Sequence, residues 1–132
     1  GYSETTLDHY ESPRNRGLLN DFNARASRTN PVCGDSLALT LRIRDEMIEA
    51  AGFEVNGCVA ATAGASVMSE QVAGQRLAVA HSLTADAIES ALDGLPPGRG
   101  HGAVLAAETL AAALADYSAR AGGAADVKRN AL

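Results

Sequence analysis

Two cysteines, an aspartate and a histidine are the residues of this chain whose types and spacing could support chemistry. Cys33 and Asp35 share the segment NPVCGD, Cys58 follows a glycine, and His101 lies between two glycines. Two thiolates, one imidazole and one carboxylate form a suitable tetrahedral set for zinc, and the same thiolates could hold iron in a cluster. The sequence therefore predicts a metal site made of these four residues.

Each of these residues also has a purely structural interpretation. A cysteine among small residues is commonly a buried small hydrophobe, and Asp35 could cap a turn. A Cys33–Cys58 disulfide is a further alternative. The glycines beside both thiols and the lack of a secretion signal favour free thiols in a reducing compartment, so we expect a cytoplasmic protein. His9 and His81 are interpreted as structural.

Length and composition limit the class of protein. With 132 residues, 46% of them hydrophobic, the chain is expected to form one domain over residues 1–120. The small and polar residues 121–132 predict a frayed tail. A net charge of −5 argues against a nucleic-acid partner, which requires clustered Lys and Arg. No apolar run approaches the roughly 18 residues needed to span a membrane, so a membrane partner is not expected either.

Period-2 patterning predicts a β-hairpin in the middle of the chain. Apolar and other side chains alternate cleanly over residues 37–43, and a second strand is expected over 47–55 after a polar turn at 44–46. One residue of the second strand is out of phase, which predicts a bulge near residues 50–52. Residues 14–32 are expected to be irregular or weakly extended.

Helical periodicity and capping residues predict four helices around this hairpin. They are expected over residues 3–10 with Ser3 as N-cap, 59–73, 84–94 with Thr84 as N-cap, and 101–120. On the last helix, the expected buried stripe consists of Val104, Ala107, Ala111, Leu114 and Tyr117 or Ser118. A hairpin-based sheet followed by helices predicts an α+β sandwich.

This order of elements places the four candidate ligands at three element boundaries. Cys33 and Asp35 fall in the loop before the first predicted strand, Cys58 at the junction from strand to helix, and His101 at the start of the last helix. Unsatisfied N–H groups at a helix start favour a thiolate, so a lowered pKa is expected for Cys58.

Several motifs, in order along the chain, resemble those of the iron–sulfur cluster scaffold family of the IscU and NifU N-terminal type. The matching segments are Tyr2-Ser3, residues 8–15 (DHYESPRN), residues 30–35 (NPVCGD), and Phe53 followed by residues 57–70. The resemblance extends over about residues 2–120. It implies a three-stranded antiparallel sheet packed on helices.

The resemblance also implies a function. Proteins of this family are not enzymes but scaffolds or carriers that hold a [2Fe–2S] cluster while it is assembled and then pass it on. Cys33, Asp35, Cys58 and His101 fall on the family's ligand positions. A cysteine desulfurase and iron–sulfur acceptor proteins are the implied partners, and an oxygen ligand such as Asp35 suits a cluster that must leave.

Two departures from the family pattern affect this expectation. Gly102 lies where the family carries a third cysteine, which accepts persulfide and binds metal, so a scaffold compromised in persulfide acceptance is expected. The chaperone-binding motif Leu-Pro-Pro-Val-Lys is kept as Leu95, Pro96, Pro97, glycine and Arg99, which weakens the expectation of an Hsp70-type partner at these residues. The alternative is a zinc-binding paralogue with a structural or regulatory role and no part in cluster assembly.

Overall fold

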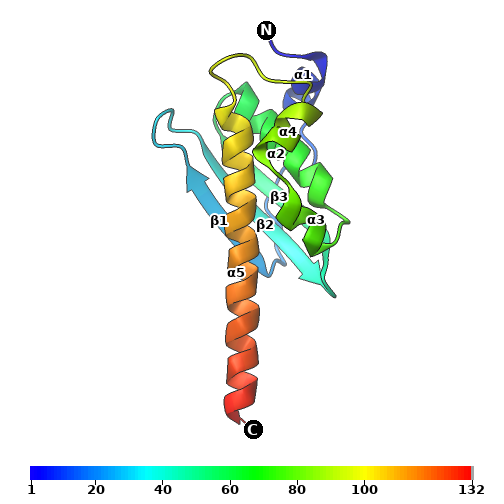
Figure 1. The fold of residues 1–132 in the computed structure, drawn as a ribbon, viewed down its shortest axis with the longest axis vertical. Helices are drawn as coiled ribbons and strands as arrows, with labels where there is room; N and C mark the ends of the chain where they lie inside the picture. Colours follow the sequence, from blue (N-terminus) through cyan, green and yellow to red (C-terminus); the bar gives the residue numbers. More distant parts are fainter. Residues whose placement is uncertain (132) are drawn as a thin grey trace.

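The computed structural model describes the backbone of residues 1–131 and the side chains of residues 1–121. The frayed tail expected over 121–132 therefore falls almost entirely outside the described side chains. In chain order the elements are α1 (Glu4–Glu11), β1 (Ala24–Thr29), β2 (Ser36–Arg44), β3 (Met47–Asn56), α2 (Val59–Val72), α3 (Leu77–Ser82), α4 (Ala85–Ala91) and α5 (His101–Ala131) (Figure 1).

The strands form one antiparallel sheet in the order β1-β2-β3, and α2 and α5 pack across one of its faces (Figure 1). Alternate residues of β2, namely Leu37, Leu39 and Leu41, are at most 1% exposed under these helices. On β3, Phe53 lies opposite Leu39 and is fully buried. The predicted α+β fold with a small antiparallel sheet on helices is confirmed.

The hairpin between β2 and β3 closes through two residues with positive φ angles. Asp45 has φ 54° and Glu46 has φ 64°, the conformation that matches the right-handed twist of a tight hairpin. The register shifts between Arg42, which pairs with Ala50, and Ile43, which pairs with Ile48, so Glu49 is the extra residue. The bulge thus lies one residue before the expected positions 50–52. It directs the side chain of Ile48 toward the core, where this residue is fully buried.

The segment expected to be irregular or weakly extended contains the regular strand β1 over residues 24–29, which the sequence did not mark as a separate element. The register places Ala24 opposite Leu41 and Ala26 opposite Leu39, so the residues of β1 that face α5 are small. Because α5 passes close over this edge strand, small side chains replace the branched ones that usually mark a strand. The apolar alternation in the sequence is therefore limited to two alanines, Ala24 and Ala26.

Capping residues set the helix starts as the sequence predicts. The Ser3 side chain accepts a hydrogen bond from the N–H of Thr6 (3.0 Å), and the Thr84 side chain accepts one from Ala87 (3.1 Å). Helix α2 ends at Val72, two residues before Gly74 with φ 80°. The short helix α3 is an element that the periodicity did not predict.

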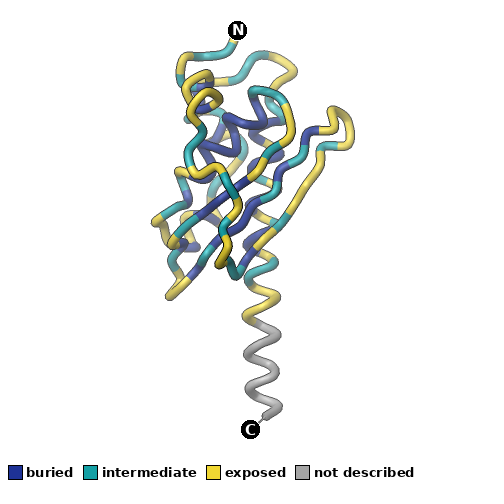
Figure 2. The backbone as a smooth tube through the Cα atoms, turned by 180° about the vertical axis from the view of Figure 1, so that it is seen from behind, coloured by how far each residue is buried: buried dark blue, intermediate teal, exposed yellow. Residues whose placement is uncertain are grey.

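Of the predicted stripe on α5, Leu114 is buried, and Ala107 and Tyr117 pack partly buried against the core, but the most buried positions are others. Ala103, Ala106, Leu110 and Ala113 are at most 2% exposed, whereas Val104 is 43% exposed. Figure 2 shows the buried positions concentrated in the sheet and the helices against it. In an alanine-rich helix small residues occur on every side, so hydrophobicity alone does not select the face that packs. Among the described residues, none of the helices combines the length and apolarity required to cross a membrane.

Candidate metal centre

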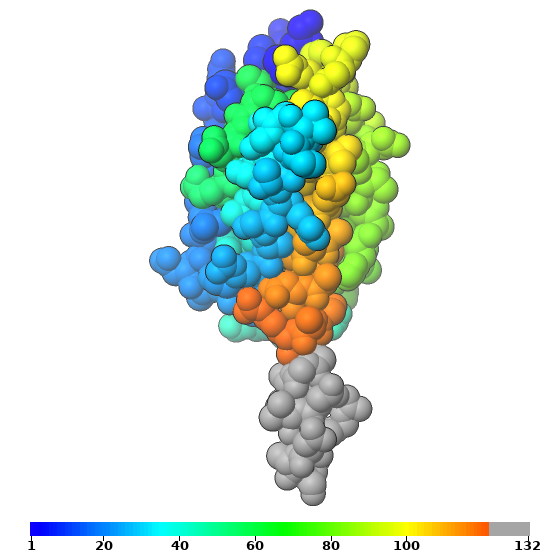
Figure 3. Space-filling model, turned by 90° about the vertical axis from the view of Figure 1, so that its left-hand side faces the viewer, coloured from blue at the N-terminus to red at the C-terminus, as the bar shows by residue number. Residues whose placement is uncertain are grey.

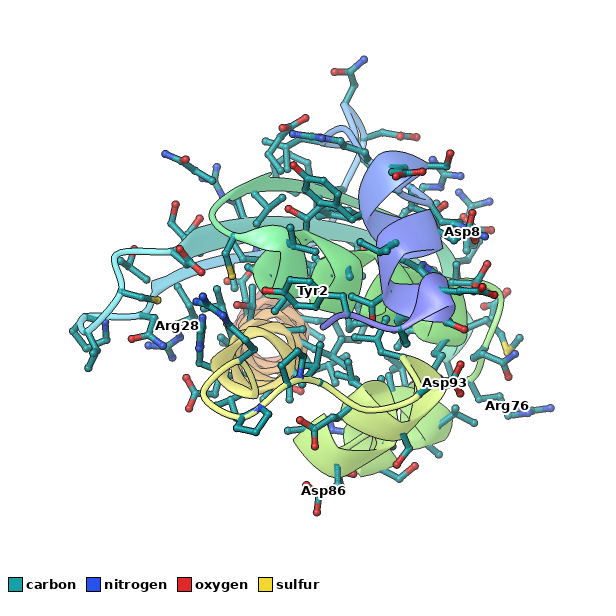
Figure 4. The ribbon with its side chains drawn as sticks, turned by 90° about the horizontal axis from the view of Figure 1, so that it is seen from above. Tyr2, Asp8, Arg28, Arg76, Asp86 and Asp93 are labelled. Atoms are coloured by element: carbon teal, nitrogen blue, oxygen red, sulfur yellow. The ribbon has the colours of Figure 1, made fainter. Side chains whose placement is uncertain are left out.

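The four candidate ligands lie where the β1–β2 loop meets the starts of α2 and α5. Figure 4 shows these three segments from above. The register of the hairpin explains part of this arrangement. Ser36 pairs with Asn56, so Asp35 lies beside Gly57. A Cβ atom at Gly57 would lie 2.7 Å from Cγ of Asp35, so only glycine allows this approach. Cys58 follows as the N-cap of α2.

Three of the ligands form a compact group. One donor atom each from Cys33, Asp35 and His101 can be chosen so that all lie within 4.8 Å of one another. Nε2 of His101 lies 3.6 Å from Oδ2 of Asp35 and 3.6 Å from Sγ of Cys58. Cys58 is not one of these three residues, but its Sγ atom lies beside the imidazole of His101. The structure brings all four predicted residues together.

The site lies at the surface with a graded exposure of its ligands. Asp35 is buried, Cys58 and His101 are half-buried, and Cys33 is exposed on a loop whose neighbour Val32 is 94% exposed. The space-filling view shows this loop (cyan) on the surface, close to the segment before α5 (yellow) (Figure 3). An ion can therefore reach the group from the side of Cys33.

A backbone carbonyl orients the imidazole of His101. Nδ1 lies 3.2 Å from the carbonyl oxygen of Gly98. Because a carbonyl oxygen only accepts, Nδ1 donates in this contact, and Nε2 is the ring nitrogen that faces Asp35 and Cys58. This is the usual way in which a second hydrogen bond prepares a histidine to bind a metal.

The carboxyl group of Asp35 and the thiol of Cys58 have opposite pKa shifts. Burial opposes ionisation of Asp35, but hydrogen bonds from the side chain and backbone of Cys58, with smaller contributions from Cys33 and His101, hold its pKa below the usual value. Burial raises the pKa of the Cys58 thiol, and the carboxylate of Asp35 raises it further. The backbone N–H groups of Ala61 and Ala60 act in the opposite direction but do not prevail.

The expected lowering of the Cys58 pKa was therefore wrong. The N–H groups at the start of α2 do favour the thiolate, as the sequence predicts, but desolvation is the larger effect. Both cysteines are free, so the disulfide alternative is not realised. His9 is buried with Nδ1 2.7 Å from Oγ of Ser66, and His81 is exposed on α3, so neither belongs to this site.

The donor atoms of the site suit a metal that accepts sulfur, nitrogen and oxygen ligands together. Thiolate, imidazole and carboxylate are all ligands of zinc, and thiolates with an imidazole are ligands of iron in clusters. The residues that sequence reasoning missed are Gly57 and Gly98, which contribute through the backbone. The glycines were visible in the sequence, but their contacts join segments far apart along the chain.

Comparison with known proteins places this chain in a family. Residues 1–124 match the family described as NifU-like N terminal domain. The chain is 36% identical over 131 residues to the iron–sulfur cluster assembly scaffold protein IscU 1 of Archaeoglobus fulgidus, which covers 99% of this chain and 86% of that protein. It is 39% identical over 123 residues to IscU of Escherichia coli K12, with 90% and 95% covered.

The chain belongs to the NifU-like N-terminal domain family. The fold agrees: a NifU-like N-terminal protein from Brucella abortus superposes with a TM-score of 0.72 at 21% identity, over 88% of this chain and 93% of that one. Members of this scaffold family are not enzymes, and the relatives named here are iron–sulfur cluster assembly scaffold proteins. Iron–sulfur cluster assembly is thus the general context of the four-residue group.

The segment with the expected chaperone-binding residues forms the loop before α5. Leu95 is half-buried and packs against the core, and Pro96 is half-buried as well. Pro97 and Arg99 are exposed, and the N–H of Arg99 donates to the carbonyl of Pro96 (3.0 Å). The side chains available to a partner here are therefore a proline and an arginine.

Proposed function

We propose that this protein is a scaffold or carrier that holds iron or a [2Fe–2S] cluster at Cys33, Asp35, Cys58 and His101 during assembly and transfer. The observation that supports it most is the group of thiolate, carboxylate and imidazole within 4.8 Å, which Cys58 joins at 3.6 Å. Residues 1–120 act as one domain in this proposal. The two free cysteines fit a cytoplasmic location.

The proposal includes impaired acceptance of persulfide sulfur. The resemblance implies a sulfur-accepting cysteine at the position of Gly102, and the chain contains only two cysteines. Of these, Cys58 is half-buried with a raised pKa, which lowers the fraction of reactive thiolate. Cluster sulfur is then supplied by a desulfurase inefficiently, or the cluster is received from another protein.

The proposed partners are a cysteine desulfurase and iron–sulfur acceptor proteins. An Hsp70-type chaperone is not proposed, because Gly98 replaces the apolar valine of the family's recognition motif. Exposed Arg99 keeps the positive charge but not the apolar anchor.

Anaerobic reconstitution with iron and sulfide tests the cluster. We expect a sulfide-to-iron charge-transfer spectrum with about two irons and two sulfides per site. The Cys58→Ser variant should lose the spectrum, since it removes one of the two thiolates. A colourless wild-type protein that retains zinc and binds no iron would contradict the proposal.

Sulfur transfer is tested separately. The protein is incubated with a cysteine desulfurase and cysteine, and bound sulfur is measured by mass spectrometry, with IscU of Escherichia coli as the positive control. We expect much less persulfide on this chain than on the control. Equal labelling of the two proteins would contradict the impaired acceptance.

The second candidate function is a zinc site for stability or regulation. The observation that favours it is the mixed set of sulfur, oxygen and nitrogen donors, which suits zinc without any redox demand. The metal content of the reconstituted protein separates this candidate from the first.

A further inference from the structure

Helices α2 and α5 make an unusually close backbone contact at Gly102. A Cβ atom on Gly102 would lie 2.5 Å from both the carbonyl carbon and the carbonyl oxygen of Ala60, and 2.8 Å from the nitrogen of Ala61. Distances below 3.0 Å are essentially never seen for real Cβ atoms. All three obstructing atoms belong to the backbone, so no change of rotamer could make room for a side chain.

Both helices contribute a glycine to this contact, Gly64 from α2 and Gly102 from α5. A Cβ atom on Gly64 would lie 2.8 Å from the carbonyl oxygen of Gly102. Ala60 and Gly64 are one helical turn apart and so lie on the same face of α2. Any side chain at Gly102 must therefore push the start of α5 away from the first turn of α2.

This contact lies between two ligands of the candidate site. Gly102 directly follows His101, and Ala60 follows Cys58 by two residues. The imidazole Nε2 of His101 and Sγ of Cys58 face each other at 3.6 Å. A displacement of one helix start against the other therefore changes the separation of these two ligand atoms.

We infer that Gly102 is a positioning residue that sets the distance between His101 and Cys58, and that the site has no room for a third thiolate at this position. The inference rests on the proposed ligand set. If Gly102 only marks a lost ligand, the substitution Gly102→Cys should restore that ligand. If Gly102 allows a close contact between the helices, the same substitution should break the contact. The two interpretations predict opposite effects on metal binding.

Cobalt binding to four proteins tests the inference, because Co²⁺ reports its thiolate ligands through charge-transfer absorption. The proteins are wild type, Gly102→Cys, Gly102→Ala and Gly100→Ala. Gly100 is the matched control in the same loop, since its Cβ would meet only the Glu89 carboxylate at 3.4 Å. We expect about tenfold weaker Co²⁺ binding for both Gly102 variants, as is typical when an orienting contact of a metal site is lost.

The spectrum and the control separate a positioning role from a structural one. Gly100→Ala should bind like wild type, and Gly102→Cys should show no additional thiolate-to-cobalt intensity. Tighter binding by Gly102→Cys with a three-thiolate spectrum, or unchanged binding by Gly102→Ala, would overturn the inference alone. A wild-type protein that binds no cobalt would overturn the proposed ligand set, and the inference with it.

Circular dichroism of each variant, with and without zinc, identifies any variant that fails to fold, so that its weak Co²⁺ binding is not attributed to the geometry of the site. Gly64→Ala tests the same contact one turn further from the ligands, and we expect it to fold and to weaken Co²⁺ binding less than Gly102→Ala does. If Gly102→Ala and Gly64→Ala both remain unfolded even with zinc, the contact is a requirement of the fold, and the positioning role is rejected.

Discussion

At the scale of single residues, Asp35 links the ligands of the candidate site. Its carboxylate accepts a hydrogen bond from the backbone N–H of Cys58 (3.4 Å) and faces Nε2 of His101 at 3.6 Å. The same charge raises the pKa of the Cys58 thiol, in addition to the larger effect of burial. Asp35 therefore adds to the effect of burial, which also raises the pKa of the Cys58 thiol.

We predict that Asp35→Asn lowers the pKa of Cys58, because the substitution removes the negative charge that opposes the thiolate. The measurement is thiolate ultraviolet absorbance against pH in metal-free protein, with Cys33→Ser as the common background. Alkylation of Cys58 at neutral pH should become several-fold faster. An unchanged pKa would show that burial alone sets the reactivity of this thiol.

At the scale of elements, α1 is attached to α2 through buried polar groups. Oγ of Ser66 on α2 lies 2.7 Å from Nδ1 of His9, and it accepts a hydrogen bond from the backbone N–H of Arg14 (2.9 Å). Ser66 is fully buried and His9 nearly so. Loss of this one hydroxyl removes a hydrogen-bond partner from the buried imidazole of His9 and from the part-buried N–H of Arg14.

We predict that Ser66→Ala lowers the free energy of unfolding by about 1–3 kcal/mol, the usual cost of unsatisfied buried polar groups. Urea unfolding of the metal-free protein measures the change. Ser82→Ala on α3 is the matched control, because its hydroxyl is exposed and bonds only the nearby carbonyl of Val79. Equal stability of the two variants would refute the role assigned to Ser66.

At the scale of the whole molecule, the candidate site joins three parts of the chain that are distant in sequence. The β1–β2 loop, the start of α2 and the start of α5 each contribute at least one ligand. A metal held by all three binds the folded chain better than the unfolded one, since only the fold brings the ligands together. Metal binding and global stability are therefore coupled.

We predict that zinc at about 100 times its dissociation constant stabilises the wild-type protein by about 2.7 kcal/mol. Thermal unfolding with and without a chelator measures the shift in midpoint. Cys58→Ser should lose most of this shift, because it removes a ligand from α2. A midpoint that does not respond to zinc would argue against a shared site.

The sequence by itself determined the features that depend on local chemistry. The alternation over Leu37 to Ile43, the caps at Ser3 and Thr84, and the boundary positions of the ligands could all be predicted. Each depends on backbone periodicity or on hydrogen bonds between residues close in sequence. The order of the motifs was enough to indicate the family.

Only the tertiary structure decided the features that depend on approach between distant segments. β1 is a strand because it pairs with β2 under α5, although its sequence carries only two alternating alanines as a signal. Burial reversed the expected pKa shift of Cys58. Gly102, which reads as a missing ligand in the sequence, lies against the backbone of Ala60. Desolvation and backbone contact are properties of packed neighbours, and a sequence does not state which neighbours will pack.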